Sequence, residues 1–219
     1  NDVKNDLQKA MNNQEAEVLR LLSRRPDTDG QAEVLEHTHK EQKLGKFEPN
    51  VGKPQWQIYL KEDGSVFNNV PFSTFLPTLR FPCEQAGKEA TSYEYLPIDD
   101  CSASGLNLAT STCEKMRMHG LGVLLASAHE VREIFSEWDE DGLPTFAKGD
   151  HEKAYRQWLI HEDDYNLVVT LVWNDKVGPH GGFEVYAHRA LPFGALSSVT
   201  ICTTISQGIC LILRRRFSP

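Results

Sequence analysis

The sequence contains few cysteines, and none of them are closely paired. Five occur (Cys83, Cys101, Cys113, Cys202 and Cys210), with no Cys-x-x-Cys spacing among them. An odd number of scattered thiols is typical of a reduced, intracellular chain and argues against a disulfide framework. His37, His39 and His119 are spare nitrogen ligands. Because their spacing matches no zinc motif, zinc binding is only a minor alternative.

Long apolar runs are also missing. No segment approaches the roughly 18 to 20 apolar residues that a membrane-spanning helix needs, so we expect no membrane association. No charged-then-apolar leader is visible, and the first residue is Asn1, so we expect the natural start to lie upstream. With 40% hydrophobic residues and a mean hydropathy of -0.44, the composition is that of an ordinary globular protein.

Positive charge is scarce as well. The net charge is -8, and the excess of acidic residues lies in residues 1–145. A protein that binds nucleic acid is usually basic, so the bulk charge argues against that class. The one basic run, Arg214-Arg215-Arg216, is too short to change this conclusion.

The first half of the chain predicts two helices followed by a hairpin. Residues 4–22 and about 29–44 have helical spacing but are acidic and weakly amphipathic, so we expect a helical extension over 1–50 that lies outside the core. Alternating apolar residues in 56–70, with a turn at Asp63-Gly64, predict a β-hairpin. A capping-box pattern opens a predicted core-packing helix over 127–138.

The second half predicts mainly strands. Residues 144–150 form a predicted short strand that ends at Asp150, and 166–173 a buried strand rich in β-branched residues. The alternation in 183–191 predicts a return strand, whereas 195–213 fits either a helix or a strand. Periodicity alone therefore indicates a mixed α and β fold.

The stretch "GDHEKAYRQ" supplies the candidate functional residues of that half. Asp150 ends the predicted strand, and Tyr155 follows five positions later. An Asp before a helix most often caps the free backbone N–H groups, and a lone Tyr is often a core aromatic. The sequence "LPFG" at 191–194 is by itself an ordinary Pro-Gly turn.

The order of three motifs resembles a reverse transcriptase of retroelement type. "GDHEKAYRQWLIHEDDYNLVVTLVW" resembles the first catalytic motif of the palm, and "RALPFGALSSV" resembles the turn-and-helix motif that follows it. Upstream, "LPIDDCSASGLN" at 96–107 resembles a segment of the fingers. The resemblance covers about residues 80–200. It implies an α+β fold with fingers over 51–145 and an incomplete palm over 146–219.

The resemblance also implies roles for individual residues. Asp150 would be a catalytic metal ligand for Mg²⁺ in a two-metal site, because hard cations prefer carboxylate oxygens. Tyr155 would lie under the sugar and exclude a 2′-hydroxyl, which selects deoxynucleotides. Pro192, Phe193 and Gly194 would line the nucleotide site, where glycine allows close backbone approach. Arg156 and Gln157 would support the palm. The implied activity is template-directed DNA synthesis, and the implied partner is a primer–template nucleic acid.

Two features depart from the family. The palm needs a second acidic cluster, yet no Asp or Glu follows Glu184. Asp99-Asp100 precede Asp150, so they could replace that cluster only in a permuted palm; we expect them to belong to the fingers, with one capping a turn. The fingers motif usually carries two cations that bind triphosphate, whereas this chain has Glu94-Tyr95-Leu96. Lys88 and Arg80 are the residues that might compensate for this loss.

These departures predict a fragment that has no polymerase activity alone. The missing remainder of a polyprotein, such as that of a retrotransposon, would then be a partner. The alternative is a non-catalytic remnant that binds a protein or a nucleic acid. A third possibility is an unrelated α/β domain, in which Asp150 is simply a helix cap.

Overall fold

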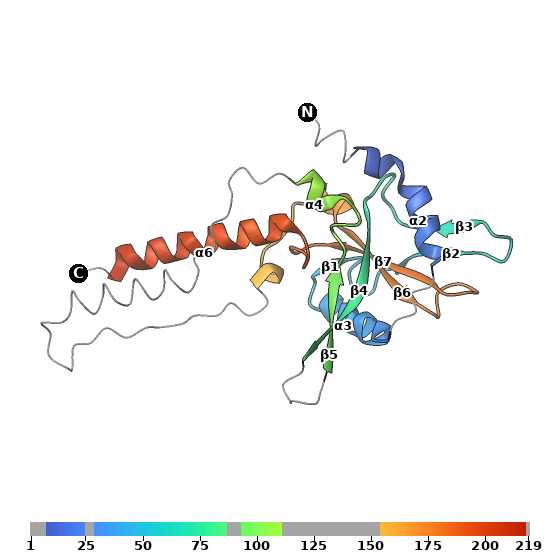
Figure 1. Cartoon of the computed structure of the whole chain (residues 1–219), viewed down its shortest axis with the longest axis horizontal. Helices are drawn as coiled ribbons and strands as arrows, with labels where there is room; N and C mark the ends of the chain where they lie inside the picture. The colour runs from blue at the N-terminus through green and yellow to red at the C-terminus, as the bar shows by residue number, and fades with distance from the viewer. Residues whose placement is uncertain (1–7, 25–28, 87–92, 111–153, 218–219) are drawn as a thin grey trace, which may run out of the picture. The chain divides into compact units, whose positions relative to one another are not determined.

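The computed structural model describes residues 8–24, 29–86, 93–110 and 154–217, and the account that follows concerns these (Figure 1). They form an α+β fold built on a seven-stranded mixed sheet. The strands run in the order β3-β2-β7-β6-β4-β5, and β1 pairs with β7 beside β2. Their bounds are β1 (Phe47–Glu48), β2 (Trp56–Leu60), β3 (Val66–Asn68), β4 (Pro77–Ala86), β5 (Tyr93–Asp99), β6 (Val169–Asn174) and β7 (Gly182–His188).

The two halves of the sequence meet at the centre of this sheet. β4 pairs in parallel with β6, with Pro77 opposite Val169. The other strand pairings are antiparallel, including β6 with β7 and β2 with β7. The hairpin predicted over 56–70 is confirmed as β2 and β3, and the buried strand predicted over 166–173 corresponds to β6. The parallel pairing of β4 with β6 joins segments far apart in the sequence, so local patterns give no sign of it.

Side chains of β6 and β7 alternate between two buried faces. Successive residues of a strand point to opposite sides of the sheet. The odd-numbered residues Leu171 and Val185 pack in one apolar cluster, whereas Val172 and Tyr186 pack in another. Every residue of β7 is buried, so this return strand is covered on both faces rather than on one.

One helix packs against each face. Helix α2 (Gln14–Leu22) contributes Val18, Leu21 and Leu22 to the odd-numbered, apolar face. Helix α3 (Gln31–Lys43) covers the even-numbered face, where fully buried Val34 packs against Phe47 and Tyr186. The interpretation of the N-terminal helices as an extension outside the core is therefore wrong.

The reason for this error is that the face under α3 is largely polar. Glu41 and Thr38 of α3 are buried, and so are Arg80, Thr170 and His188 on the strands beneath them. A helix whose buried side carries polar groups shows little amphipathicity, so the usual signal for a core helix is weak. The packing of α3 depends on specific polar partners more than on apolar area.

The remaining described elements are three short helices and one long helix. They are α4 (Leu106–Ala109), the 3₁₀ helices η2 (Ala154–Gln157) and η3 (Glu162–Leu167), and α6 (Leu196–Phe217). The segment that fits either a helix or a strand by pattern is thus helical. Among the described residues, no helix has the length and apolarity needed to cross a membrane. The helix predicted over 127–138 and the strand predicted over 144–150 lie outside the described residues.

Replacing Val34 tests whether α3 belongs to the core. We expect Val34→Ala to lower the free energy of unfolding by about 1–3 kcal/mol, because it leaves a space against Phe47 and Tyr186. Alanine is the better helix former, so the loss would come from packing. The measurement is urea denaturation. Val51→Ala, at a position 62% exposed, is the control and should change stability by less than about 0.5 kcal/mol. Equally small effects at both positions would contradict the packing of α3.

Candidate functional site

The proposed metal ligand is not among the residues that can be placed. Asp150 lies outside the described residues, as do Lys88, Cys113 and His119. Its role as a catalytic ligand therefore stays a prediction. The other candidates, Tyr155 and the turn at 192–194, are described, and the structure brings them together.

Tyr155 and Phe193 are in direct contact. Tyr155 lies in η2, and its ring meets that of Phe193 edge to face, with centroids 5.3 Å apart and an interplanar angle of 82°. Both side chains are half-buried. Edge-to-face packing is a favoured arrangement for aromatic rings and fixes their relative orientation. The two motifs quoted for the palm therefore share an aromatic contact.

The turn at 192–194 packs closely against the segment quoted for the fingers. Gly194 has a φ of +98°, in the left-handed region that favours glycine. A Cβ atom added there would lie 2.3 Å from the carbonyl oxygen of Asp99, which no side chain could tolerate. Pro192 is buried, whereas Gly194 is itself exposed. One side of this glycine is thus filled by backbone and the other is open to solvent.

Asn107 joins the same two segments through its side chain. Its Nδ2 atom donates a hydrogen bond to the carbonyl oxygen of Gly194 (2.9 Å), and its Oδ1 atom accepts one from the backbone N–H of Leu196 (2.8 Å). One amide therefore holds both ends of the turn where α6 begins. Asn107 is the last residue of "SASGLN", so all three quoted motifs meet at this turn.

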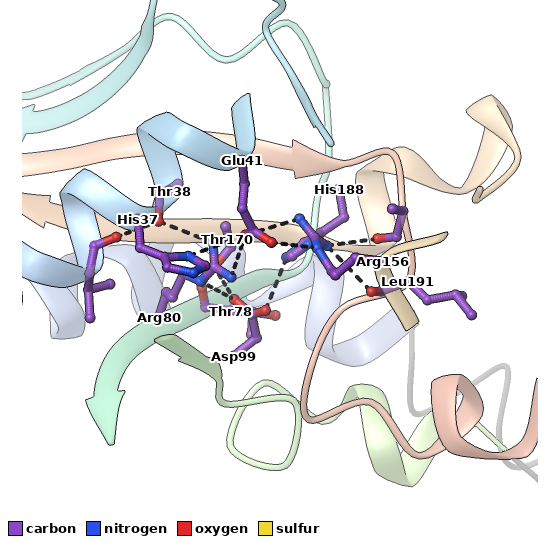
Figure 2. A network of polar contacts seen from close by, with 12 residues as sticks. His37, Thr38, Glu41, Thr78, Arg80, Asp99, Arg156, Thr170, His188 and Leu191 are labelled. Carbon is purple, nitrogen blue, oxygen red and sulfur yellow. Dashed lines mark hydrogen bonds and ion pairs between the residues drawn. The ribbon is translucent and has the colours of Figure 1, made fainter. Parts of the chain in front are cut away.

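A buried network of polar side chains extends to Leu191, the residue just before the turn (Figure 2). Arg156, next to Tyr155, is only 1% exposed and donates to Glu41 Oε1 (2.9 Å), His188 Nδ1 (2.7 Å) and the carbonyl oxygen of Ala190 (3.1 Å). Its guanidinium group also lies over the ring of Phe47, 4.7 Å from the centroid. The cation is therefore enclosed by an anion, a neutral acceptor, backbone carbonyl groups and an aromatic face.

Arg80 is the second cation of this network. It is fully buried and donates to Glu41 Oε2 (3.0 Å) and Thr38 Oγ1 (3.1 Å), and its Nε atom lies 3.5 Å from Asp99 Oδ1. Thr170 donates a hydrogen bond to the same Asp99 oxygen at 2.8 Å. With two arginines and two carboxylates, the group carries no net charge when His188 is neutral.

The partners of His188 determine its tautomer. An arginine can only donate, so Nδ1 of His188 must accept the bond from Arg156, and the proton of the neutral ring lies on Nε2. Nε2 faces Asp99 Oδ2 at 3.3 Å. Burial lowers the pKa of His188 to about 4, and the neighbouring arginines add to this effect against the opposing influence of Asp99. The ring is therefore neutral near pH 7.

The two carboxyl groups of the network remain ionised. Burial alone would raise the pKa of Asp99, but Arg80, His188 and the hydrogen bonds it accepts outweigh burial and hold that pKa below its usual range. Burial opposes ionisation of Glu41 as well, but Arg80 and Arg156 hold the Glu41 pKa below its ordinary value.

These contacts decide three expectations about charge. Arg80 cannot compensate for the cations missing from the fingers motif, because it is buried and bound to Glu41 and Asp99. Asp99 cannot serve a permuted metal site, because it is buried and its carboxylate lies against Arg80, Thr170 and His188. Asp100 accepts a hydrogen bond from the backbone N–H of Ala103 (2.9 Å), so the prediction that one of the pair caps a turn is confirmed.

Cys101 is enclosed within the fold, and His39 contacts a carboxylate. Cys101 is buried, and burial together with Asp99 and Asp100 raises the pKa of its thiol to about 12, so it stays protonated. His39 Nε2 lies 2.8 Å from Glu184 Oε2, an oxygen that also accepts a hydrogen bond from Tyr186. Within the described part of the chain, no group of three or more His, Cys, Asp or Glu side chains is arranged to hold a metal ion.

Sequence reasoning missed Glu41 and Asn107. It interpreted His188 as a solvent-facing or turn histidine, and this is wrong, because the residue is 1% exposed and lies in a strand. Glu41 and His188 lie in segments assigned to an extension and to a return strand, and their partners are distant in sequence. One signal was available in β7, where His188 and Glu184 are the two charged or titratable side chains other than Tyr186 in a strand that is apolar elsewhere. Asn107 belonged to a quoted motif, but nothing in its spacing indicated a contact with Gly194.

Comparisons with protein-family models, curated proteins and solved structures found no match for this chain. Any function has to be inferred from its residues and their contacts.

The neutral state of His188 predicts a pH dependence of stability. In the unfolded chain His188 takes up a proton near its ordinary pKa of 6.5, whereas the folded ring does so only near 4. The free energy of unfolding should therefore fall as the pH is lowered from about 6.5 to about 4, by at most roughly 3 kcal/mol from this residue. Below that range, protonation of Glu41 and Asp99 should lower it further.

Urea denaturation at a series of pH values measures this effect. His188→Asn is the comparison, because its side-chain oxygen can still accept a bond but does not titrate. This variant should show a flatter profile between pH 6.5 and 4, which separates His188 from the other histidines. Parallel profiles for the two proteins would contradict the assignment of a neutral, buried ring.

Paired glycine substitutions test the packing of the turn. Gly64 and Gly194 both have positive φ angles, but a Cβ atom at Gly64 would meet nothing within 4 Å. Gly64→Ala therefore measures the backbone strain alone. We expect Gly194→Ala to lower the free energy of unfolding by at least about 1 kcal/mol more, because its methyl group would displace the backbone of Asp99. Equal losses in chemical denaturation would show that the turn does not pack against Asp99.

Proposed function

We propose that this chain provides the fingers and the first part of the palm of a reverse-transcriptase-like nucleotidyltransferase. One observation supports this proposal above the others: the three motifs that resemble the family, although far apart in sequence, meet at one turn. Tyr155 contacts Phe193, Asn107 binds the backbone of Gly194 and Leu196, and Asp99 packs against Gly194. An unrelated fold has no reason to bring these three segments together.

The chemistry of the turn suits a nucleotide. Gly194 leaves its backbone open on the solvent side, so a flat base or a sugar can approach it closely. The half-buried ring of Tyr155 packs edge to face with the ring of Phe193, and this contact makes the Tyr155 ring a rigid surface. A fixed aromatic ring under a sugar leaves no space for a 2′-hydroxyl group, and this is the role we assign to Tyr155.

Magnesium belongs to the proposal only through Asp150. Asp99, whose backbone packs against the turn, does not fit a metal site, because Arg80 and Thr170 already occupy Oδ1 and His188 faces Oδ2. We therefore derive no chemical step through the metal from the described residues. Within the 219 residues no acidic residue follows Glu184, so we expect the chain to bind substrates without extending a primer by itself.

A second candidate function is the binding of a protein partner through α6. This helix has no acidic residue, and Leu196, Ile201 and Ile212 are exposed large apolar side chains along it. Among the α6 side chains that the structure describes, that of Ser198 alone is buried. Before its C-terminal Arg214-Arg215-Arg216, this helix carries no charged side chain, and so long an uncharged stretch with little cover is more typical of a buried element than of a free surface.

Nucleotide binding tests the first proposal. We expect the full chain, with Mg²⁺ and a primer–template whose primer lacks a 3′-hydroxyl, to bind dUTP at least about tenfold more tightly than UTP, which differs from it at the 2′ position alone, a difference of about 1.4 kcal/mol. Tyr155→Ala should bring the two dissociation constants close together. Tyr155→Phe keeps the ring and is the matched control, so it should retain the preference. Fluorescence anisotropy of labelled nucleotides gives both constants.

Two results would contradict this function. One is the absence of binding by either nucleotide at millimolar concentration. The other is a preference that Tyr155→Ala leaves unchanged.

Filter binding of the primer–template at several salt concentrations separates the two candidates. Salt-sensitive binding supports a nucleic-acid partner, whereas no binding at low salt favours a protein partner.

A further inference from the structure

Glu41 holds both arginines of the buried network. Its Oε1 atom accepts from Arg156 Nε at 2.9 Å, and its Oε2 atom accepts from Arg80 at 3.0 Å and from Arg156 NH2 at 3.3 Å. The carboxylate is 4% exposed, so water cannot substitute for these bonds. Both oxygens are used, and the orientation of the carboxylate is fixed by two cations from different elements.

Arg156 transmits this orientation to the nucleotide side of the molecule. Its guanidinium is a planar fork, so fixing Nε and NH2 on Glu41 also fixes the direction of NH1. NH1 donates to His188 Nδ1 and to the carbonyl oxygens of Ala190 and Leu191, the last at 3.4 Å. One guanidinium therefore connects η2 with the backbone that leads directly into the turn at 192–194.

The two aromatic residues of the candidate site lie on either side of this link. Tyr155 immediately precedes Arg156, and Phe193 follows Leu191 by two residues. The separation of their ring centroids, 5.3 Å, depends on where η2 stands relative to residues 190–191. Backbone hydrogen bonds from Leu191 N–H to Trp158 O (3.0 Å) and from Ile160 N–H to Arg189 O (2.9 Å) hold the residues just after η2 in this relation. Arg156 is the side chain that fixes η2 itself, and Arg156 is oriented by Glu41.

We infer that Glu41 is a positioning residue for the nucleotide site: through Arg156 it sets the placement of Tyr155 against Phe193, and so the discrimination between deoxynucleotides and ribonucleotides. The part concerning discrimination rests on the proposed function. Glu41 lies in α3, outside all three motifs that resemble the family. The specificity of the site thus depends on a residue that touches neither the nucleotide nor Tyr155.

Fluorine NMR tests the positioning step without any nucleotide. 3-Fluorotyrosine placed at position 155 in the full chain reports the ring current of Phe193, and Phe193→Leu gives the resonance expected when that ring is lost. Glu41→Gln keeps the shape of the side chain but removes its charge. We expect it to move the resonance at least halfway toward the Phe193→Leu value.

The matched control is Glu36→Gln, on the same helix. Glu36 is exposed and pairs with Lys40, so this variant should leave the resonance unchanged. Glu41→Gln also removes a buried charge, so a second variant is needed in case it does not fold. Glu41→Asp keeps the charge but shortens the side chain. It should shift the resonance in the same direction by a smaller amount.

A folded Glu41 variant with an unshifted resonance would overturn the inference. Titration with dUTP and UTP then tests the second step, in which Glu41→Gln should reduce the dUTP preference at least threefold while Glu36→Gln keeps it. A shifted resonance with an unchanged preference would overturn the specificity role. If the resonance shifts but the parent chain binds no nucleotide, positioning by Glu41 is supported and the proposed function fails.

Discussion

The burial of Arg80 and Arg156 under α3 is the constraint on which the rest of the structure depends. Two guanidinium groups with little or no solvent contact are costly unless each has an anion and a full set of acceptors. Glu41 and Asp99 supply the anions, and Thr38, His188 and backbone carbonyl groups supply further acceptors. The arginines lie in β4 and η2, and their side-chain partners lie in α3, β5 and β7, so all of these elements must be in place at once.

Such a network contributes to specificity more than to stability. An apolar face under α3 could be as stable, since removing charges from water offsets much of their mutual attraction. The polar arrangement, however, pairs both arginines with carboxylates in the observed register of the strands. A shift of β7 by one residue would turn His188 to the other face and remove the bond from Arg156 to Nδ1 of that ring. The network therefore defines where residues 190–194 lie, and with them the candidate site.

The candidate site is a consequence of that placement. Arg156 binds the carbonyl group of Ala190, just before the turn at 192–194. Asn107 binds the carbonyl group of Gly194, and the backbone of Asp99 packs against the same glycine. Tyr155 reaches the turn because Arg156, its neighbour, is anchored on Glu41. Gly194 is open to solvent on one side, and α6 carries several exposed apolar side chains. We expect a nucleotide to bind at the first of these features, and a protein partner would bind at the second.

The sequence by itself determined the local elements. The hairpin with its Asp-Gly turn, the two N-terminal helices and the buried strand β6 follow from short-range patterns, because turn chemistry and hydrophobic period act within a few residues. Motif order also selected Tyr155 and residues 192–194, and these do meet. The family, its metal and the role of Asp150 stay predictions.

Only the tertiary structure decided which residues act together. The parallel pairing of β4 with β6, the burial of α3 and the convergence on Gly194 join segments far apart in sequence. Glu41 illustrates the physical reason. On a weakly amphipathic helix it has the pattern of a solvent-exposed acid, and only its two arginine partners make burial favourable. A local pattern cannot report a partner that the fold brings from the other end of the chain.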